Sequence, residues 1–254
     1  MLKVILCGIN GKMGQTIVND VSKINYIEII AGVDVCPTEN NGNIPVFHNI
    51  NEVKEKADVI IDFSRPAALN DILAYARKNN IGAVLATTGY TSEDAEEIEK
   101  ASEAIPIFRS ANMSLGVNLQ IALVKKAAKV LSDQFDIEII ENHHNQKADA
   151  PSGTALMIAD AINSVESEKK EIIFGRHGVN HKREDEICIH AVRGGTIVGE
   201  HEVLFLGNDE ALEITHRAYS KEVFSQGAIR AAEFLADKKP GLYSMNDLLE
   251  GILD

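Results

Sequence analysis

The sequence is poor in cysteine and in aromatic residues, and it has no tryptophan. Its three cysteines, Cys7, Cys36 and Cys188, are an odd number at wide spacings without a CxxC pair, which argues against a disulfide framework or a structural zinc site. No apolar run reaches the ~18 residues of a membrane span. The short apolar N-terminus becomes glycine-rich too soon for a signal peptide. We therefore expect a cytoplasmic protein without a membrane partner.

Positive charge is also scarce, with 25 Lys and Arg against 38 Asp and Glu and a net charge of −13. Because nucleic-acid binding needs a basic face, we expect no nucleic-acid partner. Basic residues nevertheless gather in two segments, 143–147 and 176–183. A local basic patch in an acidic protein is typical of a small-anion site, although the second segment is read equally well as a solvated loop.

The first 112 residues alternate apolar strand-like runs with helical patterns. The runs lie at 2–7, 27–34, 58–63, 81–86 and 105–108. This rhythm predicts a parallel sheet with helices on both faces.

The pattern then changes to a long helix at 115–131, a strand at 135–141, a helix at 153–164 and only strands between 171 and 217. We predict an α/β protein of two domains. A Rossmann-type parallel-sheet domain would contain residues 1–113 and 222–254, including a returning helix near 222–236. An α+β domain with an open mixed sheet, for substrate binding and oligomerisation, would contain residues 114–221.

A glycine-rich loop, Gly8-Ile9-Asn10-Gly11-Lys12-Met13-Gly14, follows the first strand and opens a helix. Glycines there allow a pyrophosphate to approach the backbone, and the helix N-terminus supplies free N–H groups. The spacing is GxxGxxG rather than GxGxxG, but asparagine at the third position tolerates a positive φ. The pattern predicts a dinucleotide site, and the alternative is a plain strand-to-helix turn.

Asp34 ends the second strand, where an acidic residue binds the ribose 2′-hydroxyl of NAD. Its charge repels a 2′-phosphate, and Val35 rather than an arginine follows it, although Lys12 compensates in part. The sequence therefore favours NADH over NADPH and leaves dual use open.

The stretch from Glu141 to Ala155 combines two histidines, a lysine and a helix start. Ser152 is a suitable N-cap, and the N–H groups of Gly153 and Thr154 in the first helical turn suit a carboxylate. The stretch therefore predicts an anion cradle.

Proton-transfer groups precede that helix, in what we expect to be a loop. His143 can exchange a proton near neutral pH, and Lys147 can neutralise a carboxylate or donate a proton. The alternatives are solvated side chains or a metal held by His143 and His144. Adjacent histidines seldom reach one metal and no third ligand has a recognisable spacing, so we expect no metal.

The stretch from Glu141 to Ala155 resembles the signature of the 4-hydroxy-tetrahydrodipicolinate reductase (dihydrodipicolinate reductase) family of bacterial diaminopimelate and lysine synthesis. The similarity spans almost the whole chain and includes residues 8–14, 62–66, 87–89, 110–118, 193–201 and 212–216. The resemblance implies hydride transfer from NADH or NADPH to C4 of a cyclic dicarboxylate, with loss of water, giving tetrahydrodipicolinate. It also implies a homotetramer built through the second domain's sheet.

The resemblance further implies that His143 is the acid/base residue and that Lys147 is the proton donor. Substrate contacts would come from His144, Gly153 and Thr154, beside the N-cap Ser152. Nucleotide contacts would come from Gly8, Ile9, Asn10, Gly11, Lys12, Met13, Asp34, Ala86, Thr87, Thr88, Ser110, Ala111, Asn112 and Met113. The sequence departs from the family pattern at Asn145 and Gln146, where many members have basic residues, and at Ala86, where glycine is common.

Two other functions compete with this one. Another NAD-dependent amino- or imino-acid dehydrogenase would need the glycine loop but not the stretch from His143 to Thr154. A noncatalytic NADH sensor would bind nucleotide without turnover. The presence of His143 and Lys147 argues against the sensor, because it has no need of a proton donor.

Overall fold

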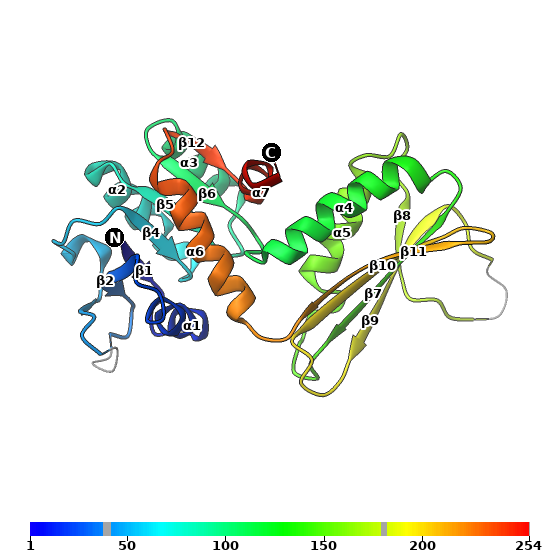
Figure 1. Ribbon diagram of the computed structural model, residues 1–254, viewed down its shortest axis with the longest axis horizontal. Helices are drawn as coiled ribbons and strands as arrows, with labels where there is room; N and C mark the ends of the chain where they lie inside the picture. The colour runs from blue at the N-terminus through cyan, green and yellow to red at the C-terminus, as the bar shows by residue number, and fades with distance from the viewer. Residues whose placement is uncertain (38–41, 179–181, 254) are drawn as a thin grey trace. The chain divides into compact units, whose positions relative to one another are not determined.

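A computed structural model of the chain (Figure 1) describes residues 1–37, 42–178 and 182–253. Strands and helices alternate in the first part of the chain, and strands dominate between residues 171 and 218. Within these ranges, no helix is both long and apolar enough to cross a lipid bilayer.

The chain forms two compact units, each with its own sheet (Figure 1). The first unit contains Met1–Leu115 together with Lys221–Asp254, and the second contains Gly116–Ser220. The C-terminal segment therefore belongs to the first unit, which the chain leaves once and re-enters once.

The first unit is built on a seven-stranded parallel sheet in the order β12-β6-β5-β4-β1-β2-β3. Its central strands are apolar and buried on both faces, as expected for a parallel sheet between two helix layers. The strands are β1 (Leu2–Cys7), β2 (Ile27–Val33), β3 (Val46–Phe47), β4 (Val59–Asp62), β5 (Gly82–Leu85), β6 (Pro106–Arg109) and β12 (Gly241–Tyr243).

Helices cover both faces of this sheet. On one face α1, α6 and α7 contribute Ile17, Leu235 and Leu248 to a common core, and on the other α2 and α3 contribute Ile72 and Ile98. The helices are α1 (Lys12–Val21), α2 (Leu69–Asn79), α3 (Ser92–Ser102), α6 (Glu222–Ala236) and α7 (Met245–Leu253), with short 3₁₀ turns η1 (Ile50–Glu52) and η2 (Pro66–Ala68).

The second unit has a mixed five-stranded sheet in the order β11-β10-β7-β9-β8. In the central strand β7, Ile137 and Ile139 enter the core under α4 and α5, so odd-numbered residues of β7 face these helices and even-numbered ones face away. The elements are α4 (Leu115–Leu131), β7 (Asp136–His143), α5 (Gly153–Asn163), β8 (Glu171–Phe174), β9 (Glu186–Arg193), β10 (Gly199–Leu206) and β11 (Ala211–Ala218).

The predicted fold class is confirmed, with a parallel Rossmann-like sheet and a mixed sheet. Strand β7 is longer than predicted, because it continues to His143 instead of ending at residue 141. The expected loop position of His143 is therefore wrong: it is the last residue of a strand. The edge strands β3 and β12 were not predicted because two or three residues are too few to show a period.

Candidate active site

The loop after β1 brings the backbone close to any group bound above it. Gly8 has a φ of 79°, and a Cβ atom there would lie 2.5 Å from the carbonyl oxygen of Phe63. Only glycine fits that position. Gly11 is the N-cap of α1, and no side chain caps the first turn, which begins at Lys12. The N–H groups and the positive end of the helix dipole therefore face the loop, as at phosphate sites.

Next to this loop, a cavity of about 390 Å³ has the size of a small-ligand site. Gly8, Gly11 and Asp34 line it, so the structure brings together three of the predicted nucleotide residues. The cavity also holds the charged side chains of Arg65 and Asp71, which the sequence analysis did not single out.

Asp34, in the lining of that cavity, is fixed by backbone groups. Its Oδ2 accepts a hydrogen bond from the Asn10 N–H at 3.0 Å, and its Oδ1 accepts one from the Cys36 N–H at 3.0 Å. Each carboxylate oxygen has a second lone pair for a further donor such as a hydroxyl. The geometry suits the predicted contact with a ribose.

Other predicted nucleotide residues lie outside this cavity. Ile9 is buried in the core, so only its backbone can face a ligand, while Lys12 is exposed and Met13 is half-buried. Ala86 and Thr87 are buried after β5 and Thr88 is exposed. After β6, Ser110 Oγ donates to the Asn112 carbonyl, Ala111 is exposed and Met113 is buried in the core.

Asp62 ends β4 and organises the neighbouring loops. It is fully buried, and four groups donate hydrogen bonds to it: the N–H and hydroxyl of Ser64, the hydroxyl of Thr87 and the hydroxyl of Tyr90. Burial raises the pKa of the Asp62 carboxyl, and these donors offset the rise only in part. Because its hydroxyl is committed to Asp62, Thr87 is held in place within the fold.

In the second unit, the end of the mixed sheet carries the other predicted site. His143 ends β7 and is 8% exposed, and its neighbours across the sheet are Arg193 on β9 and Gly199 on β10. As odd-numbered residues of β7, Glu141 and His143 both face the side of α4 and α5. His143, Arg193 and Gly199 of this site are therefore held by strands.

Glu141 is a fully buried carboxylate with four donors. Its Oε1 accepts from the Ser152 N–H at 2.9 Å and from Arg193 Nη2 at 2.7 Å. Its Oε2 accepts from Arg193 Nη1 at 2.8 Å and lies 2.5 Å from His143 Nδ1. Burial raises the pKa of the Glu141 carboxyl, but Arg193, His143 and the Ser152 N–H outweigh it, so the net pKa is lowered. Glu141 is therefore ionised at neutral pH.

The imidazole of His143 is held neutral at pH 7. Burial lowers its pKa, and this effect exceeds the opposite influence of Glu141. The pKa of the neighbouring His201, whose ring centroid lies 5.2 Å away, is lowered by burial to about 3. Both rings therefore offer lone pairs rather than charge in the resting protein.

The N-terminus of α5 lies beside these histidines. Ser152 is its N-cap, as predicted: the hydroxyl accepts from the Ala155 N–H at 3.2 Å and lies 3.0 Å from His201 Nε2. The next residue, Gly153, is exposed and has open space around its Cα, and Thr154 is half-buried. A carboxylate can therefore approach the first turn of α5 close to His143.

Lys147 and His144 lie in the loop between β7 and α5. Lys147 is half-buried, its Nζ lies 2.8 Å from Asp149 Oδ1, and its N–H donates to the His144 carbonyl at 3.1 Å. The carbonyl of Asp149 accepts from Arg193 Nη2 at 2.6 Å, which ties this loop to the sheet. His144 is half-buried. The structure thus gathers His143, His144, Lys147, Ser152, Gly153 and Thr154 at one end of the second unit.

In the second basic segment, 176–183, the described Arg176 and Arg183 form ion pairs with acidic residues outside this site. Residues 179–181 lie outside the described part of the chain, and Arg176 pairs with Glu138 and Glu186. Because Glu138 is an even-numbered residue of β7, it lies on the face of the sheet opposite His143. The arginine charge at residue 176 is neutralised there rather than available for an anion.

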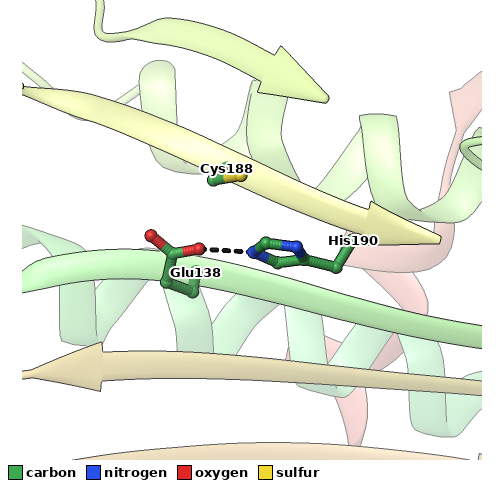
Figure 2. A group of neighbouring side chains, drawn as sticks. All are labelled: Glu138, Cys188 and His190. Carbon is green, nitrogen blue, oxygen red and sulfur yellow. Dashed lines mark hydrogen bonds and ion pairs between the residues drawn. The ribbon is translucent and has the colours of Figure 1, made fainter. Parts of the chain in front are cut away.

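Glu138, Cys188 and His190 form a group with metal-ligand chemistry on that opposite face (Figure 2). Their ligand atoms lie within 4.8 Å of one another. However, one oxygen of Glu138 binds Arg176 at 2.6 Å and the other binds His190 at 2.6 Å, and burial raises the pKa of the Cys188 thiol. A bound cation would have to displace a guanidinium and a thiol proton, so these residues fit an ion-pair network better than a metal centre.

Sequence reasoning gave no role to Glu141, Arg193 or His201, although it quoted all three within matching segments. A signal for Glu141 was present. The alternation that buries Ile137 and Ile139 continues to residues 141 and 143, so it places a carboxylate and an imidazole together on the core face. A charged residue at such a position needs buried partners.

Comparison with known proteins agrees with this geometry. The family model "Dihydrodipicolinate reductase, N-terminus" matches residues 2–113, and "Dihydrodipicolinate reductase, C-terminus" matches residues 116–249. The 4-hydroxy-tetrahydrodipicolinate reductases of Caldanaerobacter subterraneus subsp. tengcongensis and Clostridium novyi are 53% and 47% identical, each over 98% of this chain and 99% of the relative.

A solved structure leads to the same family. Dihydrodipicolinate reductase from Paenisporosarcina sp. TG-14, with dipicolinate bound, has a TM-score of 0.82 and 27% identity over 97% of this chain and 99% of that one. The resemblance stated from the sequence motifs is thereby confirmed. Two family models that together cover almost the whole sequence, and full-length relatives near 50% identity, show that the chain belongs to the 4-hydroxy-tetrahydrodipicolinate (dihydrodipicolinate) reductase family of oxidoreductases.

Proposed function

We propose that this chain reduces 4-hydroxy-tetrahydrodipicolinate to tetrahydrodipicolinate with NAD(P)H and loss of water, as a step of diaminopimelate and lysine synthesis. The observation that carries the proposal is the end of the mixed sheet, where a neutral histidine, a lysine and the exposed first turn of α5 lie together. A ring that carries carboxylates and must exchange protons needs these three features.

The reaction requires two proton transfers around one hydride transfer. When bound, a nicotinamide cofactor would supply the hydride for C4. His143 Nε2, unprotonated at neutral pH, would accept a proton from C5, the ring carbon between C4 and the imine carbon, while Lys147 protonates the departing 4-hydroxyl, which leaves as water. Once a hydride has been added at C4, the proton held by His143 would return to C5 and restore the imine. Solvent reprotonates Lys147, so the sum is consumption of one hydride and one proton and release of one water.

The start of α5 would orient the substrate. The N–H groups of Gly153 and Thr154, with His144 alongside, would bind one substrate carboxylate, and the cation of Lys147 would face developing negative charge. The bound dipicolinate in the Paenisporosarcina relative supports a dicarboxylate ligand for this fold.

For the cofactor we propose NADH over NADPH. Asp34 supports this choice, because its carboxylate lies where a ribose hydroxyl would be accepted and a 2′-phosphate repelled. Arg65 lines the same cavity and supplies a cation that keeps NADPH usable. Gly8, Gly11 and the first turn of α1 would hold the pyrophosphate.

Two further predictions stay with this proposal. The side of the mixed sheet that faces away from α4 and α5 would pair subunits in the homotetramer implied by the family resemblance. A cytoplasmic location is expected for a reaction that draws on the NAD(P)H and amino-acid precursors of the cell.

The decisive experiment generates the unstable substrate in situ with its synthase and follows the absorbance of NADH after adding this protein. We expect rapid NADH loss, and loss of that activity in His143→Ala and Lys147→Ala. Lys126→Ala on the exposed side of α4 is the control and should stay at wild-type rate. A folded protein that binds NADH yet consumes none of it would favour the sensor, and turnover with other imino acids only would favour a different dehydrogenase.

A further inference from the structure

The buried pair formed by Glu141 and His143 carries an inference about how the catalytic ring is prepared, and it rests on the proposed function. We propose that Glu141, held by Arg193, is a positioning residue that fixes His143 as the Nδ1–H tautomer, so that Nε2 is the only reactive nitrogen. Gly199 completes the arrangement by leaving space at that nitrogen.

The hydrogen-bond donors around Glu141 determine the tautomer of His143. An ionised carboxylate only accepts hydrogen bonds, and Arg193 and the Ser152 N–H supply three of the four donors around it. The fourth position faces His143 Nδ1 at 2.5 Å. Two acceptors at that distance would repel each other, so Nδ1 must carry the proton. In the neutral ring, Nε2 then carries the lone pair.

Arg193 makes this arrangement independent of the state of the histidine. A fully buried carboxylate without a cation would tend to take up a proton, and it could then donate to Nδ1 and invert the tautomer. The two guanidinium hydrogen bonds at 2.7 and 2.8 Å keep Glu141 ionised. Arg193 thus acts on the reaction through Glu141 rather than through the substrate.

The steric part of the arrangement comes from β10. A Cβ atom built on Gly199 would lie 3.1 Å from His143 Nε2 and 3.5 Å from its Cδ2. Such an atom would both push the ring and crowd the nitrogen that has to reach the substrate. The absence of a side chain at residue 199 leaves Nε2 accessible.

The direct test reads the ring nitrogens by magic-angle-spinning ¹⁵N NMR of histidine-labelled protein, with His143 assigned by its absence in His143→Gln. In the wild type at neutral pH we expect a protonated Nδ1 and an unprotonated Nε2 for His143. Finding the Nε2–H tautomer in the wild type would overturn the inference, whether or not the protein shows reductase activity.

The Glu141→Gln variant sharpens the test. Its amide can donate to Nδ1, so we expect a shift of His143 toward the Nε2–H form and a fall in kcat of about 100-fold, below the ~10⁴ seen when the orienting carboxylate of a Ser-His-Asp triad is lost. Because Glu141 raises the pKa of His143, the limb of the pH–rate profile that reports this histidine should move to lower pH. An unchanged tautomer together with wild-type kcat would contradict the role of Glu141.

Two more variants separate positioning from general damage. Glu138→Gln makes the same change three residues away on the opposite face of β7, at a carboxylate that also binds an arginine and a histidine, and should leave the His143 signals unchanged. Gly199→Ala retains Glu141, so it should keep the Nδ1–H tautomer while lowering kcat about tenfold through crowding. Wild-type kcat in Gly199→Ala would refute the steric part. If the wild type proves inactive on the proposed substrate, the NMR result still decides the tautomer.

Discussion

Each sheet of this protein ends on a fully buried carboxylate with four hydrogen-bond donors, yet the pKa values of the two carboxyls are shifted in opposite directions. Asp62, beside the nucleotide loops, is bound by three hydroxyls and one N–H, and its pKa is raised by burial. Glu141, beside His143, is bound by a guanidinium, an imidazole and one N–H, and its net pKa is lowered. A cation among the donors therefore decides whether the pKa of a buried carboxyl moves up or down.

The difference extends to the surroundings of the two groups. The end of the first sheet presents glycine backbone and the side chains of Asp34, Arg65 and Asp71 around a cavity. The end of the second sheet concentrates Glu141, Arg193, His143, Lys147 and Asp149, which can move protons and stabilise charge. Variants at the two ends should accordingly separate binding from chemistry.

The largest effect is expected at the second sheet. Lys147→Ala should lower kcat by about 100-fold or more, the usual contribution of a general acid, while the NADH dissociation constant stays near the wild-type value. Steady-state kinetics and nucleotide titration by fluorescence measure the two quantities. An unchanged kcat would remove the lysine from the mechanism and weaken the division between the two ends.

A smaller, opposite effect is expected at the nucleotide cavity. Asp34→Ala should weaken the binding of NADH about tenfold, because a charge-assisted hydrogen bond worth roughly 1.5–3 kcal/mol is lost. The binding of NADPH should weaken less, because the repulsion between Asp34 and the 2′-phosphate disappears as well. Arg65→Ala should weaken NADPH more than NADH. KM values for both cofactors provide the test, and equal losses for both cofactors in both variants would contradict the assigned contacts.

The pH dependence of stability should also distinguish the two ends. The folded-state pKa of His201 is about 3, below its ordinary value of 6.5. The contribution of this shift to the free energy of unfolding is therefore complete above pH 6.5 and is lost as the pH falls toward 3. The loss is at most about 1.4 kcal/mol per pH unit. Urea unfolding at pH 7 and pH 5 should therefore show a smaller difference in His201→Gln than in the exposed control His177→Gln. An equal difference between pH 7 and pH 5 in the two variants would argue against a neutral, buried ring at His201.

The smallest effect is expected at Asp62. Asp62→Asn should cost about 1 kcal/mol or less, because the hydroxyls of Ser64, Thr87 and Tyr90 can rotate to accept from an amide, whereas Asp62→Ala should cost about 1–3 kcal/mol by leaving them without a partner. Thermal unfolding measures both. If the asparagine variant were the more damaging one, the hydroxyls could not have accepted from the amide, and the contrast with Glu141 would fail.

Much of this architecture was predictable from the sequence. The helix bounds 115–131 and 222–236 agree with the structure, because long amphipathic patterns leave little freedom. Helix α3 begins with a capping box formed by Thr91 and Asp94, residue types that favour a helix start. The N-cap role of Ser152 is also present, and it depends only on local geometry.

What escaped prediction depends on contacts between residues far apart in the chain. Arg193 meets Glu141 across 52 positions and His201 meets Ser152 across 49, and no local pattern encodes such partners. Arg65 reaches the same cavity as Asp34 only through the order of strands in the sheet. Even so, the buried side of β7 could have been read from its alternation, and this would have moved His143 from a loop to a strand.

The return of the chain to the first unit has a consequence for synthesis on the ribosome. Helix α6 supplies Ala228, Ala232 and Leu235 to the core that also contains Val84 and Phe108. It is translated only after the 105 residues from Gly116 to Ser220 have been added. At a synthesis rate of about 5–20 residues per second, that apolar face of the sheet stays without α6 for roughly 5–20 s. The inserted unit can therefore complete its fold first, and the nascent first unit is the one that chaperones should recognise.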